Sequence, residues 1–155
     1  MPDGQDSLTT EPDLAILVVG AAHAIGARLR RELNAAGFPV RQPHGYVLRA
    51  LYDRPLALTA LAELLGVTKQ AVGPVVDEMV GLGLVERRID PADRRSKLLA
   101  LTARGGAARA RALEVSAALE REIPDAPAVR AGLLAIIEAE GFGEDAAHRR
   151  ARPVW

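Results

Sequence analysis

Three residues near the middle of the chain, Gly66-Val67-Thr68, separate two short amphipathic segments. The first segment, residues 59–65, has leucines at helical spacing, and Thr59 is its expected N-cap. The second segment ends at Gly83, and its predicted inner face consists of Val72, Val75, Val76, Met79 and Val80. A glycine that closes one helix, a buried residue and a threonine that caps the next bring two helices together at a steep angle. The segment therefore predicts a helix-turn-helix, with its second helix over residues 69–82.

A β-hairpin is predicted directly after this unit. Residues 84–89 alternate weakly in polarity, and residues 98–101 are apolar and stop at Thr102. The eight residues between them, 90–97, form a charged loop that begins with Asp90-Pro91. Two short strands joined by such a loop form a hairpin of the wing type.

Two helices are predicted before the helix-turn-helix. Residues 13–36 have apolar side chains every three or four positions, with Asp13 as N-cap and Gly37 at the end. Residues 42–53 form the second helix, which Arg54-Pro55 stops. Its predicted inner face consists of Val47, Leu48 and Leu51.

Two further helices are predicted after the hairpin. One runs from Thr102 to about Glu122, and Gly105-Gly106 should weaken its first turn. The last covers residues 129–140, with Leu133, Leu134, Ile136 and Ile137 as the predicted buried face. The predicted fold class is mainly α with a small β-hairpin wing (α+β), in one domain over residues 13–142. Residues 1–12 are expected to be a disordered acidic leader and residues 143–155 a loose tail.

The composition excludes several classes of protein. The chain has no cysteine, so it has no disulfides and no thiolate chemistry, and a reducing cytoplasm is its expected location. Residues 1–13 contain four acidic residues and no basic one, the reverse of a signal peptide. The apolar run over residues 14–27 is shorter than the roughly 18–20 residues that cross a bilayer, so no membrane association is expected.

No arrangement of side chains supports catalysis, a metal site or a cofactor. None of the three serines (Ser7, Ser96, Ser116) lies in a nucleophile motif. The three histidines (His23, His44, His148) lack the spacing of metal ligands, and no phosphate-binding lysine follows the paired glycines. We therefore expect a protein that is not an enzyme and that needs no cofactor.

Four stretches identify a family. They are residues 61–73 (LAELLGVTKQAVG), 76–79 (VDEM), 83–87 (GLVER) and 90–102 (DPADRRSKLLALT). In this order and spacing they strongly resemble MarR-family winged helix-turn-helix regulators. The close match covers about residues 56–102, and the flanking helices agree with the family's layout.

The resemblance implies a homodimeric transcriptional repressor that binds a pseudo-palindromic double-stranded DNA operator and is often released by a small aromatic ligand. Residues 43–102 would be the DNA-binding lobe, and residues 13–36 and 103–140 the dimerisation helices. The ligand would bind where these helices meet the lobe. The polar and aromatic residues near that junction are the candidates: His23, Phe38, His44, Tyr46, Arg49 and Tyr52.

The second helix of the motif would enter the major groove with its N-terminal residues first. Thr68 and the free amides beside it suit a phosphate, and Lys69 adds positive charge. Gln70 has the donor and acceptor that fit the edge of adenine, and Gly73 allows close approach of the backbone. Asp77 and Glu78 would be repelled by phosphate, so only the first half of the helix is expected to enter the groove.

The wing gathers positive charge in a chain that is neutral overall. Residues 87–111 contain eight basic and two acidic residues, a local net charge of +6. By the family pattern Arg95 inserts into the minor groove, where a narrow A·T tract is most negative. Asp93 would hold the Arg95 side chain by a charge-assisted hydrogen bond, and Arg94 and Lys97 would contact flanking phosphates.

Pro74 departs from the family pattern. It removes the amide that would bond the Gln70 carbonyl, at a cost on the order of 3 kcal/mol in a helix interior. Near a helix start, a local kink absorbs this cost, and we favour a functional helix. Two alternatives stay open: a winged-helix protein-interaction module that has lost DNA binding, and a regulator that senses no ligand and is controlled by its own abundance.

Overall fold

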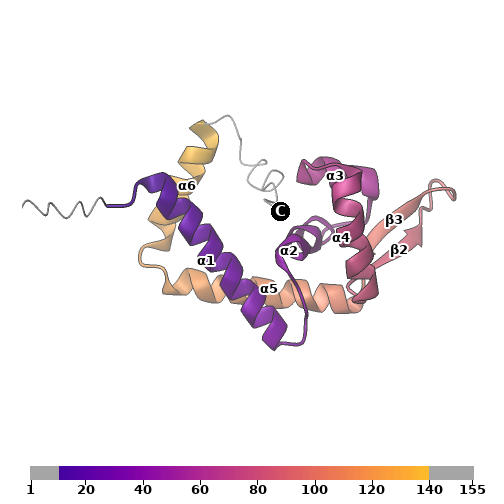
Figure 1. The fold of residues 1–155 in the computed structure, drawn as a ribbon, viewed down its shortest axis with the longest axis horizontal. Helices are drawn as coiled ribbons and strands as arrows, with labels where there is room; N and C mark the ends of the chain where they lie inside the picture. Colours follow the sequence, from indigo (N-terminus) through magenta and orange to yellow (C-terminus); the bar gives the residue numbers. More distant parts are fainter. Residues whose placement is uncertain (1–10, 140–155) are drawn as a thin grey trace, which may run out of the picture.

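The computed structural model describes residues 11–139, and most of them are helical (Figure 1). The leader up to residue 10 and the tail from residue 140 lie outside the described residues. In chain order the elements are α1 (Leu14–Ala35), α2 (Gln42–Ala50), β1 (Leu56–Ala57), α3 (Leu58–Leu65), α4 (Lys69–Gly81), β2 (Val85–Ile89), β3 (Lys97–Leu101), α5 (Ala103–Glu122) and α6 (Ala126–Ala139). The predicted fold class, mainly helical with a small β-sheet, is confirmed.

The elements from α2 to β3 form a lobe, and its core is aliphatic. The largest fully buried side chains include Leu48 of α2, Leu61 of α3, Met79 of α4 and Leu99 of β3. Burying a leucine or methionine stabilises a fold by about 1.5–3 kcal/mol, so these contacts fix the three helices against the sheet. The inner faces predicted for α2 and α4 are confirmed, except that Val80 is only half-buried.

The sheet has three antiparallel strands in the order β1-β3-β2. The predicted hairpin is β2 and β3, with Val85 opposite Leu101 and Ile89 opposite Lys97. The strand β1 was not predicted. It pairs Leu56 with Leu99 and Ala57 with Leu98, directly after Pro55. Two residues are too few for an alternating pattern, so this strand leaves no periodic signal in the sequence.

Three predicted boundaries need correction. Helix α3 begins at Leu58 with Ala57 as N-cap, so Thr59 lies inside the helix and is not its cap. Helix α2 ends at Ala50, three residues before the predicted end. Helix α6 begins at Ala126, because Pro127 fits a first helical turn, in which an amide needs no partner.

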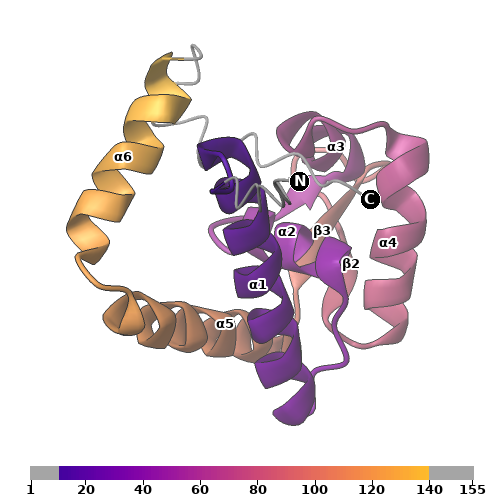
Figure 2. The same ribbon diagram turned by 60° about the vertical axis from the view of Figure 1, so that its left-hand side comes forward.

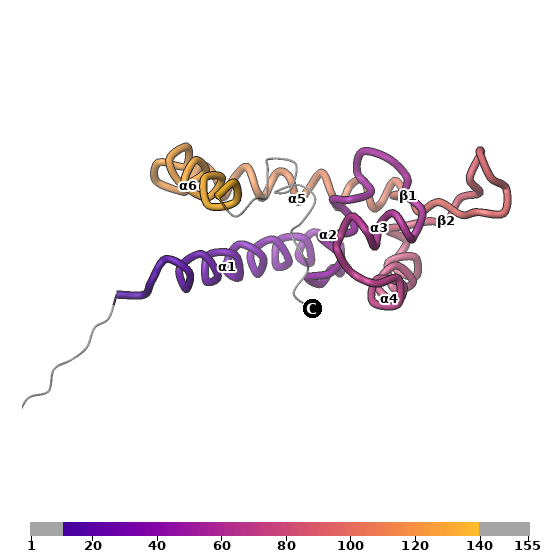
Figure 3. The backbone as a smooth tube through the Cα atoms, turned by 90° about the horizontal axis from the view of Figure 1, so that it is seen from above, coloured from indigo at the N-terminus to yellow at the C-terminus, as the bar shows by residue number. Residues whose placement is uncertain are grey.

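Helices α1 and α5 extend from the lobe as two long arms (Figure 3). Asp13 caps α1 as predicted, accepting a hydrogen bond of 3.0 Å from the Ile16 amide. The two arms are linked by ion pairs: Arg28 Nη2 donates to Glu122 Oε1 at 2.7 Å, and Arg111 Nη2 lies 3.3 Å from Glu32 Oε2. These pairs join the two arms at two places along their length.

Helix α6 stands away from the lobe (Figure 2), and none of its described side chains is buried. Leu133 is 41% exposed and Ile136 is 44% exposed. The prediction that α6 buries its apolar face is therefore wrong within this chain. The outer half of α1 is apolar and exposed as well, at Leu14, Ile16, Leu17, Val18, Val19 and Ile25.

The start of α5 lies against the end of α4 and the sheet. Thr102 caps α5, and its hydroxyl also donates to the Gly83 carbonyl at 2.6 Å. A Cβ on Gly105 would lie 2.0 Å from the Leu84 carbonyl oxygen. Gly105 therefore allows a close backbone contact, and this first turn is firmly packed where the sequence predicted a weak one.

Among residues 11–139, no helix is both long enough and apolar enough to cross a bilayer.

Candidate nucleic-acid interface

Helix α4 presents its first turn to solvent. The Thr68 side chain accepts a hydrogen bond of 3.1 Å from the Ala71 amide, which confirms the predicted N-cap. Thr68, Lys69 and Gln70 are exposed, and Gly73 is half-exposed. The α4 residues that were predicted to contact DNA therefore lie together at one accessible helix start, where the helix dipole favours a phosphate.

Helix α4 continues through Pro74 without interruption from Lys69 to Gly81. Gln70, whose carbonyl loses its helical partner, is exposed, as is Pro74 itself. Water is therefore available to replace the missing hydrogen bond. This geometry agrees with the interpretation in which the helix tolerates the proline.

The two acidic residues of α4 are ion-paired. Asp77 Oδ1 accepts a hydrogen bond of 2.6 Å from Arg87 of β2, which also ties the helix to the wing. Glu78 pairs with Arg41 at the start of α2. Their charges are thus largely balanced, and the expected repulsion from phosphate is weaker than the sequence suggests.

The wing, residues 85–101, projects from the lobe beside α4 (Figure 1). Its loop is organised by Asp93, whose carboxylate accepts from the Arg95 amide at 3.0 Å and from the Ser96 hydroxyl at 2.6 Å. The hydrogen bonds from the Ser96 hydroxyl and from the Arg95 amide hold the pKa of Asp93 below its ordinary value. Asp93 was expected to hold the Arg95 guanidinium; it instead fixes the backbone, because an aspartate at a turn readily bonds the amide two residues on.

Three of the eight basic residues in segment 87–111 stay available to contact a polyanion. Arg94, Arg95 and Lys97 are exposed and form no ion pair within residues 11–139. The others are engaged: Arg87 with Asp77, Arg88 with Glu86, Arg104 with the Gly37 carbonyl, Arg109 over the Tyr52 ring and Arg111 with Glu32 and Glu114. The net charge of +6 therefore overstates the positive charge that the wing can offer to a polyanion.

The six predicted ligand residues lie at different places in the arms and the lobe. His23 is exposed on α1, and His44 is fully buried in the lobe. The Phe38 ring lies under Arg104, 5.9 Å from its guanidinium carbon, and the Tyr52 ring lies 5.3 Å from that of Arg109. Tyr46 is half-buried and Arg49 exposed, both on α2.

A groove of about 620 Å³ lies elsewhere, between α1, the start of α2 and α4. Its lining residues are Arg30, Arg41, Gln42, Pro43, Ala71, Pro74 and Val75. None of the six predicted residues is among them. The residues predicted from the sequence are histidines, aromatic residues and one arginine, whereas the groove is lined by two arginines, a glutamine, two prolines, an alanine and a valine.

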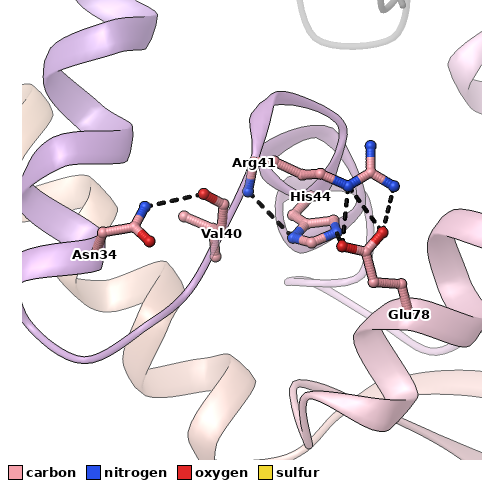
Figure 4. Close-up of polar contacts among 5 residues, drawn as sticks. All are labelled: Asn34, Val40, Arg41, His44 and Glu78. Atoms are coloured by element: carbon pink, nitrogen blue, oxygen red, sulfur yellow. Dashed lines mark hydrogen bonds and ion pairs between the residues drawn. The ribbon is translucent and has the colours of Figure 1, made fainter.

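A polar cluster joins the start of α2 to α4 (Figure 4). Arg41 Nε donates to both carboxylate oxygens of Glu78, at 3.0 and 2.8 Å, and Nη2 adds a third contact. His44 Nδ1 accepts from the Arg41 amide at 3.3 Å, and His44 Nε2 lies 3.4 Å from Glu78 Oε1. Sequence reasoning missed this cluster, because Glu78 is 37 positions from Arg41 in the chain.

The pKa values of this cluster follow from its surroundings. The Arg41 hydrogen bonds lower the pKa of Glu78 from 4.5 to about 2. Burial lowers the pKa of His44, an effect that the nearby Glu78 carboxylate only partly opposes. At neutral pH the cluster therefore contains a neutral imidazole beside a charged Arg41–Glu78 pair.

Acid is expected to destabilise the fold in two pH windows. Folding disfavours the charged His44 imidazole, so the free energy of unfolding should fall as the pH drops below 6.5, the ordinary pKa of histidine. The contribution of Glu78 is complete above pH 4.5 and is lost as the pH falls toward 2. Urea unfolding between about pH 7.5 and about pH 5.5 isolates the first window. The His44→Gln variant should lose most of this pH dependence of the free energy of unfolding, and the variant with the exposed His23 changed to Gln should retain it. An equal pH dependence in both variants would contradict the assignment to His44.

Comparisons with known proteins agree with this geometry. Residues 37–96 match the model of the MarR family. Over 75 residues the chain is 39% identical to the HTH-type transcriptional regulator PetP of Rhodobacter capsulatus, a match that covers 48% of this chain and 39% of PetP. Over 97 residues it is 34% identical to the transcriptional regulator HosA of Escherichia coli O111:H-, covering 62% of this chain and 69% of HosA.

A solved structure extends the match to the helical arms. The crystal structure of CouR from Rhodococcus jostii RHA1 bound to p-coumaroyl-CoA superposes with a TM-score of 0.59 and 30% identity, covering 80% of this chain and 91% of CouR. The resemblance read from the sequence is thereby confirmed. With its capped α4, its wing and these relatives, the chain belongs to the MarR family of winged-helix transcriptional regulators.

Proposed function

We propose that this regulator is a homodimeric repressor that binds a pseudo-palindromic DNA operator. The observation that supports this most directly is a set of cations that form no ion pair within the described residues 11–139, namely Lys69 on α4 and Arg94, Arg95 and Lys97 on the wing. A helix start enters the major groove while arginines on the wing reach the backbone or the minor groove. As in the sequence analysis, the proposed DNA contacts are Thr68, Lys69, Gln70, Gly73, Arg94, Arg95 and Lys97, with Asp93 shaping the loop.

Selection of bound duplexes from a random library tests this proposal. Enrichment of one sequence with two inverted half-sites is the expected result, because two copies of α4 related by a two-fold axis read the same bases on opposite strands. A pool that stays random would favour the alternative, a winged-helix module that has lost DNA binding.

Dimerisation is expected through the exposed apolar faces of α1 and α6. Six large apolar side chains on α1 and three on α6 (Val129, Leu133, Ile136) are exposed in the single chain, more than a soluble monomer usually leaves uncovered in one region. Sedimentation at micromolar concentration should give about twice the 16.5 kDa mass of the chain. Leu133→Glu and Ile136→Glu should shift the population toward monomer, whereas Ile89→Glu, exposed on the wing, serves as the control. A monomeric wild-type protein would contradict the proposed operator symmetry.

A small ligand with an aromatic or other apolar body is proposed to release the repressor from DNA. The groove beside α4 offers the space, and CouR, a relative in fold and sequence, was crystallised with the aromatic thioester p-coumaroyl-CoA. The groove is proposed as a binding site in addition to the six residues chosen from the sequence. A panel of phenolic compounds added to the duplex-binding assay tests release, and a panel without effect would favour a regulator controlled by its own abundance.

A further inference from the structure

We propose that Pro74 contacts the 5-methyl group of a thymine in the major groove, beside the base that Gln70 contacts. The inference rests on the proposed function, since it adds a specificity-determining residue to the DNA contacts proposed above. It gives a role in sequence recognition to the proline that departs from the family pattern in this helix.

Pro74 lies on the side of α4 that faces away from the lobe. The buried residues of the helix mark the opposite side: Val72, Val75, Val76 and Met79. Because an α-helix has about 3.6 residues per turn, Gln70 and Pro74 lie one turn apart on the outward side. Both residues are exposed. They therefore belong to the surface that the proposed docking turns toward the bases.

The neighbours of Pro74 leave its ring accessible on this surface. Gly73, directly before it, has no side chain to cover the ring. Asp77, the next residue along the outward side, accepts a hydrogen bond of 2.6 Å from Arg87 and is thereby tied to the wing. Pro74 is thus the last residue of this surface before its acidic part.

The chemistry of a proline ring restricts what it can recognise on DNA. The ring has no donor or acceptor, and the proline nitrogen has no proton, so Pro74 can bond neither a base edge nor a phosphate. Each base pair presents donors and acceptors in the major groove, and thymine adds an apolar methyl group. A contact with this methyl is favourable for the ring, which also loses almost no side-chain entropy when it is buried.

The position of the thymine follows from the geometry of the helix. Helix α4 runs without interruption from Lys69 to Gly81, so Gln70 and Pro74 are about 6 Å apart along its axis. Successive base pairs are about 3.4 Å apart. The selected operator should therefore contain a thymine within about two base pairs of the adenine that Gln70 contacts.

Replacing thymine by uracil tests the contact at a single group. Deoxyuridine lacks the 5-methyl group and keeps the base pairing, so the edge is otherwise unchanged. Each thymine of the selected operator is replaced in turn, symmetrically in both half-sites, and the affinity is measured by fluorescence anisotropy. At one position near the Gln70 base, the affinity of the wild-type protein should fall by about fourfold for each half-site, as expected when one methyl group loses its apolar contact.

Two variants show whether this loss depends on Pro74. Pro74→Ser should bind the thymine and uracil duplexes with equal affinity, because it removes the ring. The serine also restores the amide that bonds the Gln70 carbonyl, so the helix should be kept, which urea unfolding checks. Lys97→Ala, on the exposed part of the wing, is the matched control. It should weaken binding of both duplexes by the same factor and retain the fourfold difference, because the two sites act independently.

Three outcomes would contradict the inference. If uracil weakened binding of Pro74→Ser as much as that of the wild type, another residue would contact the methyl group. An enriched operator to which no uracil substitution weakens binding would overturn the contact with Pro74 and sustain the repressor. A pool that stays random would contradict the repressor and the inference together.

Discussion

Replacing Gly105 with alanine is expected to destabilise the protein by about 3 kcal/mol or more, or to prevent folding altogether. The added Cβ would lie 2.0 Å from the Leu84 carbonyl oxygen and 3.0 Å from its carbonyl carbon. Both are backbone atoms of the residue directly before β2, so they cannot rotate away as a side chain would. Relief requires α5 to separate from the lobe, which breaks the Thr102–Gly83 hydrogen bond. Urea unfolding followed by circular dichroism measures the loss.

Gly106 is the matched control, because it lies in the same turn of the same helix. A Cβ at this position meets nothing within 4 Å. Alanine is the better helix former by roughly 0.5–1 kcal/mol, so Gly106→Ala should slightly raise the free energy of unfolding. Equal losses in the two variants would mean that α5 does not approach Leu84 closely in solution.

The second large effect is expected from Arg95→Ala, and it should differ in kind from that of Gln70→Ala. Arg95 has no ion pair within residues 11–139, and Asp93 fixes its backbone, so its guanidinium is available to the minor groove. Its loss should weaken binding to most duplexes and reduce the salt dependence by about one unit of slope. Gln70→Ala should cost about 1–3 kcal/mol on the selected operator and little on scrambled DNA.

Titration of operator and scrambled duplexes at several salt concentrations separates the two variants. If Gln70→Ala weakened both duplexes equally, Gln70 would not read a base. If Arg95→Ala changed the affinity for neither duplex, the wing would be a solvated hairpin. Another surface would then have to supply the positive charge that binds DNA.

The parts of the fold that sequence predicted well are those fixed by local chemistry. Asp13, Thr68 and Thr102 precede apolar periodic segments, and α1, α4 and α5 begin directly after them. The paired strands of the wing likewise follow from apolar residues on both sides of a charged turn. In each case the signal and its consequence lie within a few residues of one another.

What the sequence did not reveal depends on contacts between distant residues. Gly105 was expected to weaken a helix, because nothing local shows that Leu84 lies against it. Arg41 and Glu78 meet only after α2 packs on α4, and the groove beside them is lined by residues with no shared pattern. The apolar face of α6 was predicted correctly as a pattern, but its partner is absent from the chain's own lobe.

The junction around Thr102 has a mechanical consequence. Its amide donates to the Leu84 carbonyl at 3.1 Å, its hydroxyl donates to the Gly83 carbonyl, and α5 begins at the next residue. Helix α5 and the lobe are therefore expected to move together as one rigid body. In a dimer joined through the arms, the dimer interface then determines the distance and the angle between the two copies of α4, although it lies far from the DNA. Inserting a single base pair between the half-sites rotates one of them by about a tenth of a helical turn. A rigid dimer should then be unable to bind both half-sites at once.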